Sequence, residues 1–103
     1  MSAKVIALYN MPQDVQAFDK YYFANHVPLA KTMPGLTCYE VSNGKVTDIS
    51  GASPYHFVAT LSFNSLKDIQ TALASPEGAA TAGDLQNFAT GGVSLLIFES
   101  KEI

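Results

Sequence analysis

The sequence predicts an α+β fold of the ferredoxin-like type, with the order βαββαβ and a four-stranded antiparallel sheet. Three observations lead to it: apolar runs of strand-forming residues at both ends of the chain, a strictly alternating run in the middle, and two amphipathic stretches between them. The predicted strands cover residues 4–9, 36–41, 55–63 and 93–99. At 103 residues, we expect one domain that spans residues 1–103.

The first helix carries the pattern around which we expect a site. Asp14 is a residue type that caps helix N-termini, and Pro28 disfavours the α conformation at Val27. The helix should therefore begin after Asp14 and end or change direction close to His26. One helix face is apolar and aromatic and ends in an imidazole: Val15, Phe18, Tyr22 and His26.

The strand at residues 55–63 is predicted to have two different faces. It follows a turn at Asn43–Gly44 and a polar stretch, residues 45–54, which we interpret as a surface loop. Alternation places one set of side chains on the first face: Tyr55, Phe57, Ala59, Leu61 and Phe63. The other face carries a less apolar set: His56, Val58, Thr60 and Ser62.

A second helix should start at Ser65, because Asp68 three residues later completes a capping-box pattern. Its inner positions would be Leu66, Ile69 and Leu73. Ser75–Pro76 then looks like the start of a further short helical segment, since proline is favoured at the first helical position.

The first and last strands predict a partner chain. Both are apolar at successive positions, as expected for strands that are covered on both faces. Two helices can cover only one face of the sheet, so the other face needs a second copy of the chain. We therefore expect a homodimer joined through its sheets.

Composition excludes several classes of protein. A net charge of −3 with six scattered basic residues argues against nucleic-acid binding. No apolar run is long enough to cross a membrane, and the N-terminus lacks the pattern of a secretory signal, so we expect a cytoplasmic protein. With one cysteine and two separated histidines we expect no disulfide and no metal site, and without a glycine-rich fingerprint no nucleotide cofactor.

Two motifs resemble those of the EthD family, which is named for ethyl tert-butyl ether degradation. The first is Phe18-x-x-x-Tyr22-x-x-x-His26-x-Pro28-Leu29-Ala30, followed by Pro34-Gly35-Leu36. The second is Ser75-Pro76-Glu77-Gly78, followed by Asp84-Leu85 and Asn87-Phe88. The resemblance implies a dimeric α+β barrel, in which two ferredoxin-like chains oppose their sheets and enclose cavities.

His26 and Tyr22 are the candidate catalytic residues. An imidazole on an inward-facing stripe could act as a general acid or base, with Tyr22 orienting it or donating a proton. The alternative is structural: a protonated His26 could cap a helix C-terminus, and Tyr22 could be a core residue. Further candidates for a ligand cavity are His56, Thr60, Tyr9 and Tyr39, although His56 could equally be a surface residue.

Two functions from different classes remain open. One is a binding or accessory protein that shelters a small aromatic or polyketide-like molecule and serves a neighbouring oxygenase. The other is a cofactor-free enzyme of the monooxygenase, isomerase or cyclase type, a class that the family resemblance implies, with His26 moving a proton. Because only one good titratable group faces the inferred cavity, the sequence favours the first slightly. Neither function needs a cofactor, and we expect no stoichiometric haem binding.

Overall fold

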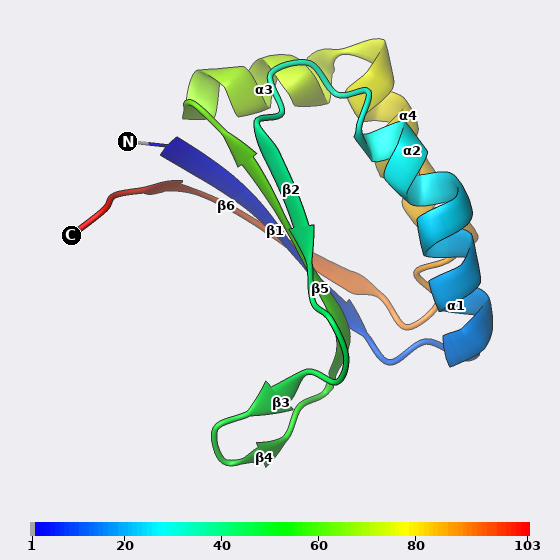
Figure 1. Ribbon diagram of the computed structural model, residues 1–103. Coiled ribbons are helices and arrows are strands. Elements are labelled where there is room, and N and C mark those ends of the chain that lie inside the picture. The colour runs from blue at the N-terminus through cyan, green and yellow to red at the C-terminus, as the bar shows by residue number, and fades with distance from the viewer. Residues whose placement is uncertain (1) are drawn as a thin grey trace.

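The computed structural model of the protein describes residues 2–103. Its main sheet has four antiparallel strands in the order β2-β5-β1-β6. The strand bounds are β1 Ser2–Asn10, β2 Cys38–Val41, β5 Tyr55–Phe63 and β6 Val93–Ser100. This is the ferredoxin-like α+β fold predicted from the sequence, with the first and last strands side by side (Figure 1).

All the helices lie on one face of this sheet (Figure 1). Their bounds are α1 Val15–Tyr21, the π-helical turn η1 Tyr22–His26, α2 Val27–Ala30, α3 Leu66–Ala74, α4 Pro76–Asp84 and the 3₁₀ turn η2 Leu85–Asn87. The three predicted caps are confirmed. Asp14 Oδ1 accepts a hydrogen bond from the Ala17 amide, and the Ser65 and Ser75 hydroxyls accept from the amides three residues further on.

The first helix does not end at His26, as Pro28 had suggested, but continues to Ala30 through η1. Val27 keeps α-helical backbone angles, and its amide bonds to the carbonyl of Tyr22, five residues back. The wider π turn lets the chain pass a proline, which has no amide hydrogen for the carbonyl four residues before it. His26 therefore lies inside a helix rather than at its C-terminus.

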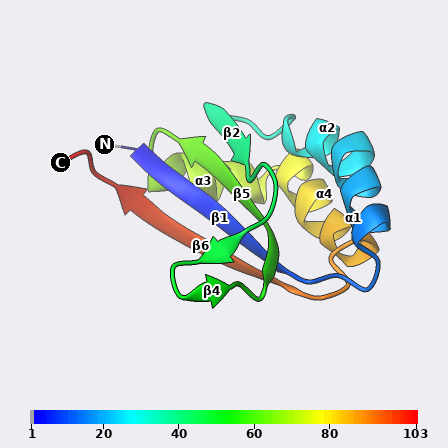
Figure 2. The ribbon, with the colours of Figure 1, turned by 60° about the horizontal axis from the view of Figure 1, so that its bottom comes forward.

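The stretch between β2 and β5 contains a small hairpin and is not the plain loop expected for residues 45–54. The strands are β3 Thr47–Asp48 and β4 Gly51–Ala52. Asp48 Oδ1 accepts hydrogen bonds from both the amide and the hydroxyl of Ser50, which closes the turn. The hairpin extends beyond the start of β5 (Figure 1), and in the turned view it lies in front of the sheet, away from the helices (Figure 2).

A β-bulge at the start of β5 breaks the expected alternation. Tyr9 pairs with Phe57 but Asn10 pairs with Tyr55, which leaves His56 without a partner on β1. The extra residue turns His56 toward the helices, where its ring meets that of Phe18 edge-on at 5.1 Å between centroids. The prediction that His56 shares a face with Thr60 was therefore wrong.

The core between helices and sheet is aromatic. Tyr9, Phe18, Tyr22, Phe57 and Phe88 are all buried and in mutual contact. The second helix buries Ile69 and Ala72, whereas Leu73, which was expected to face inward, is exposed. Val15, expected on the inner stripe of the first helix, is also exposed.

The last strand keeps its apolar side chains uncovered. Leu95, Leu96, Ile97 and Phe98 have 51, 48, 49 and 43% of their surface exposed. Leu96 lies opposite Ile6 on the helix-free face, and Leu95 lies opposite Ala7 on the helix-covered face. Leu96 and Phe98 are therefore the apolar side chains of this strand on the helix-free face, the face on which the second copy is predicted to pack.

Candidate functional site

A small cavity of about 70 Å³ lies between the sheet and the helices. Its walls are mostly apolar and come from all four strands of the main sheet and from η1, α2, α3, α4 and η2. The exposed Leu73 and Leu95 are among the lining residues. A few side chains bring polar atoms to it: Tyr9, Tyr22, His26, Tyr39 and Thr81. An apolar cavity with a few convergent polar groups is the usual form of a small-molecule site.

His26 is held in this cavity by a carboxylate from α4. Its Nδ1 lies 2.9 Å from Oδ2 of Asp84, and only 4 and 8% of the two residues is exposed. A carboxylate can only accept, so Nδ1 carries the hydrogen and Nε2 is left with its lone pair in the neutral ring. The pair thus selects one tautomer of His26.

Asp84 is itself fixed by further donors. Its Oδ1 accepts hydrogen bonds from the Tyr21 hydroxyl at 2.6 Å and from the Asn87 amide at 2.9 Å. Burial alone would raise the pKa of Asp84, but the hydrogen bonds from Tyr21, Asn87 and His26 outweigh it and hold the pKa below its usual value. Asp84 therefore remains a carboxylate at neutral pH.

His26 is kept neutral but stays reachable. Burial lowers its pKa, and the hydrogen bond and charge of Asp84 oppose that shift only partly. No described residue hydrogen-bonds to Nε2, and no fully buried side-chain nitrogen or oxygen lacks a partner, so Nε2 must be accessible. The site offers a neutral imidazole with a free acceptor nitrogen, which is what a general base requires.

A group of tyrosine hydroxyls adds a donor. The Tyr22 and Tyr39 hydroxyl oxygens are 2.6 Å apart, and the Tyr22 ring lies 5.2 Å from the His26 ring. Burial is the main cause that raises the pKa of both phenols, so both keep their hydrogens. Tyr22 also hydrogen-bonds to the hydroxyl of the buried Tyr9. Two bonds among three hydroxyls use two of the three hydrogens, which leaves one for an oxygen atom in the cavity.

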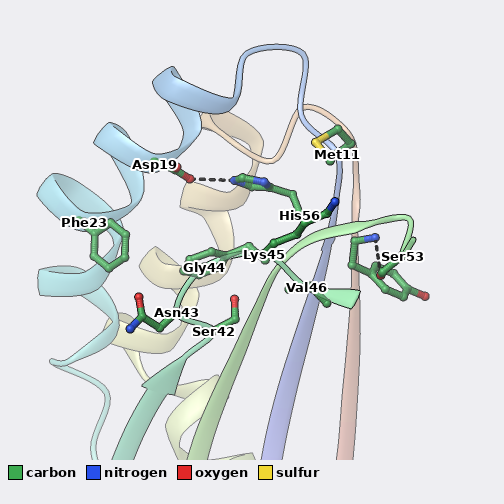
Figure 3. A pocket seen from close by; sticks show the side chains of 12 residues that line it. Met11, Asp19, Phe23, Ser42, Asn43, Gly44, Lys45, Val46, Ser53 and His56 are labelled. Atoms are coloured by element: carbon green, nitrogen blue, oxygen red, sulfur yellow. Dashed lines mark hydrogen bonds and ion pairs between the residues drawn. The ribbon is translucent and has the colours of Figure 1, made fainter. Parts of the chain in front are cut away.

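The structure brings together four of the six residues singled out from the sequence. Tyr9, Tyr22, His26 and Tyr39 line the cavity, whereas His56 and Thr60 do not. Thr60 pairs with Ile6 and Glu40 and lies on the helix-free face of the sheet. His56 lines a separate cleft, in which it is bonded to Asp19 (Figure 3).

Sequence reasoning had no role for Asp84, although it is the residue that gives His26 its chemistry. The sequence offered only a spacing, three or four residues apart, whose members the structure shows to be buried: Gly78, Thr81, Asp84 and Phe88. A carboxylate on such a buried stripe needs a partner. The 58 residues that separate it from His26 hide which partner that is.

Within residues 2–103, no cluster of three or more histidine, cysteine or carboxylate side chains could hold a metal ion. None of the helices in this range is long and apolar enough to cross a membrane.

Comparison with known proteins identifies close relatives. The family model described as EthD domain matches residues 10–92. An uncharacterized 11.0 kDa protein in the thcB–thcC intergenic region of Rhodococcus erythropolis is 37% identical over 101 residues, which cover 97% of this chain and 96% of the relative. The crystal structure of an EthD family protein from Bacillus halodurans is 35% identical, with a TM-score of 0.89 over 98% of this chain and 100% of that one.

More distant structures share the fold alone. SnoaB, a cofactor-independent oxygenase from Streptomyces nogalater, is 15% identical, with a TM-score of 0.70 over 99% of this chain and 95% of that one. A dimeric ferredoxin-like protein of unknown function from Thermobifida fusca is also 15% identical, with a TM-score of 0.71 over 97% of this chain and 92% of that one.

Proposed function

This chain belongs to the EthD domain family, and from that premise we propose that it binds a small apolar carbonyl or phenolic compound beside His26 and transfers a proton there without a cofactor. The observation that carries the proposal is the buried His26–Asp84 pair: Nδ1 is bonded to the carboxylate, Nε2 has no hydrogen-bond partner within residues 2–103, and the ring lines an apolar cavity. The similarity in fold to a cofactor-independent oxygenase agrees with chemistry of this kind, but only as an analogy.

The proposed step is abstraction of a proton next to a carbonyl group. Nε2 of His26 takes the proton as the C–H bond breaks, and the electron pair moves into a new C=C bond, which places negative charge on the carbonyl oxygen. The spare hydrogen of the Tyr9, Tyr22 and Tyr39 hydroxyls is donated to that oxygen. Asp84 stabilises the imidazolium that forms, and return of the proton to the same or another atom completes exchange or isomerisation.

A second candidate function is binding without catalysis, in service of a neighbouring oxygenase. The size of the cavity favours it. At about 70 Å³ the cavity is well below the roughly 300 Å³ at which typical ligand sites begin, so only part of a ring compound fits inside. In this case His26 and the tyrosine hydroxyls would recognise an oxygen atom of the sheltered compound.

We further propose that the protein is a cytoplasmic homodimer that pairs through the helix-free face of its sheet. The apolar side chains of Leu96 and Phe98 support this, because they are half-exposed on that face. The ferredoxin-like protein from Thermobifida fusca is described as dimeric, which agrees with a dimer of this fold.

The test is proton exchange in D₂O, followed by NMR as loss of the α-proton signals of acetophenone and phenylacetone. Exchange should be faster with the protein than without it. His26→Gln and Asp84→Asn should each reduce the rate of protein-catalysed exchange at least about tenfold. Tyr22→Phe should reduce it, whereas Thr60→Val, which removes a hydroxyl from the opposite face, should not.

Saturation-transfer difference NMR on the same samples separates the two candidates. Binding that depends on His26, without any exchange, would support the binding protein and end the enzyme proposal. If the samples show no binding and no exchange of either ketone, both candidate functions are contradicted.

A further inference from the structure

A second cleft, far larger than the His26 cavity, lies between the first helix and the start of β5. Its volume is about 360 Å³. Its walls come from the loop after β1, from α1 and η1, from residues 42–46 and from the start of β5 (Figure 3). No lining residue is common to the two cavities. We propose that this cleft is a separate binding site for a ring compound that carries an acidic hydroxyl group, a phenol or an enol.

The group that would recognise the hydroxyl is His56. Its Nε2 lies 2.8 Å from Oδ1 of Asp19 on α1, as the dashed line in Figure 3 marks. Because the carboxylate only accepts, Nε2 carries the hydrogen and Nδ1 is the acceptor of the neutral ring. No described residue hydrogen-bonds to Nδ1, and no fully buried side-chain nitrogen lacks a partner, so Nδ1 is accessible.

The bulge in β5 is what creates this arrangement. Without the extra residue opposite Tyr9 and Asn10, alternation would place His56 on the helix-free face, away from Asp19. Bulges commonly redirect a side chain at a functional site. The second histidine–aspartate pair of the chain therefore depends on a local departure from regular strand geometry.

Apolar side chains provide a surface for a ring. Met11 and Phe23 both line the cleft, yet 55 and 52% of their surface is exposed. Phe23 packs edge-on against Phe57, which also lines the cleft, with 6.0 Å between the ring centroids. An aromatic ring placed in the cleft would cover apolar surface that otherwise faces water.

Lys45 lines the same cleft as His56 and supplies positive charge to it (Figure 3). Within residues 2–103 the ion pairs involve only the two histidines, so the Lys45 ammonium is not neutralised by a carboxylate. The step proposed for this cleft is transfer of the hydroxyl proton of the ligand to His56. The ligand O–H bond breaks, the proton moves to Nδ1 of His56, the imidazolium stays paired with Asp19, and Lys45 attracts the oxygen anion.

The test uses 4-nitrophenol, whose ionised form absorbs at longer wavelength than its neutral form. At a pH just below the pKa of the probe, addition of protein should increase the ionised fraction of the probe and therefore the absorbance of its anion. His56→Gln and Asp19→Asn should weaken binding about tenfold or more, since each removes part of a charge-assisted hydrogen-bond system. Lys45→Met, a change at an exposed residue, should lower the ionised fraction of bound probe.

Three comparisons locate the probe and identify the group that is recognised. In Thr60→Val, a change outside both cavities, the titration should be unchanged. In His26→Gln the increase in anion absorbance that depends on His56 and Lys45 should remain, which separates this site from the proposed proton-transfer cavity. 4-Nitroanisole, which lacks the hydroxyl hydrogen, should bind at least about tenfold more weakly. The proposal is overturned if nitroanisole binds equally well, if His26→Gln abolishes the change while His56→Gln and Lys45→Met do not, or if no absorbance change occurs at millimolar probe.

Discussion

Replacing Asp84 with asparagine should reverse the tautomer of His26. In the wild type, Oδ1 accepts from Tyr21 and Asn87, while Oδ2 accepts from Nδ1 of His26. The new amide has only one oxygen, and it is best placed where the two donors converge. Its NH₂ group then faces His26, so the ring must present Nδ1 as an acceptor and move its hydrogen to Nε2.

The cost in stability follows from the His26 contact. A hydrogen bond to a charged group contributes about 1.5–3 kcal/mol and a neutral one about 0.5–1.5 kcal/mol, so a reversed neutral bond loses roughly 1–1.5 kcal/mol. If the ring keeps its original tautomer, two donors face each other in a buried place, and the loss approaches about 3 kcal/mol. We expect the free energy of unfolding to fall by about 1–3 kcal/mol.

Urea unfolding measures this loss, and long-range ¹H–¹⁵N correlations identify which nitrogen of His26 carries the hydrogen. The reversed tautomer removes the lone pair of Nε2, so proton exchange by the variant should also fall. An unchanged tautomer together with a loss below about 0.5 kcal/mol would refute the role assigned to Asp84.

Three other outcomes follow from the same structure. Because burial lowers the folded-state pKa of His26 below its unfolded value of about 6.5, the unfolded chain binds more protons in that window. The free energy of unfolding should therefore fall as pH drops from about 6.5 to the folded-state pKa of His26. Urea titrations of His26→Gln should not show this fall. If the variant and the wild type have the same pH dependence, His26 is not its cause. Tyr22→Phe should lower the free energy of unfolding by about 0.5–1.5 kcal/mol in the same urea experiment, because the 2.6 Å contact between the Tyr22 and Tyr39 hydroxyls is lost. A decrease no larger than that in Thr60→Val would show that this contact does not stabilise the fold. Leu96→Asp should shift sedimentation from dimer to the 11.0 kDa monomer, and a dimer that persists would rule out the helix-free face as the interface.

The fold could be predicted almost completely from local patterns. Strand alternation from Phe57 onward, the three caps and the Ser75–Pro76 helix start depend on neighbouring residues, and each is found where it was expected. The differences arise where one residue adjusts the backbone. The π turn before Pro28 lengthens the first helix, and the bulge at His56 redirects a side chain. Neither feature produces a recognisable hydrophobic pattern in the sequence.

The candidate site could be predicted only in part. The spacing of Tyr22 and His26 along one helix placed them together, because four residues return to the same face. Asp84 approaches His26 only through the packing of α4 against the first helix, and no local rule links residues 58 positions apart. Thr60 was assigned to a cavity because the face of a strand is visible in sequence, whereas the element that covers that face is not.

The most direct test of the central claim is an NMR titration of His26 in the wild-type protein. The account predicts a neutral ring with its hydrogen on Nδ1, a pKa below the unfolded value of about 6.5, and a change in the His26 signals when acetophenone is added. A raised pKa at His26, with signals that do not respond to the ketone, would contradict the claim that this histidine is the base of a proton-transfer site.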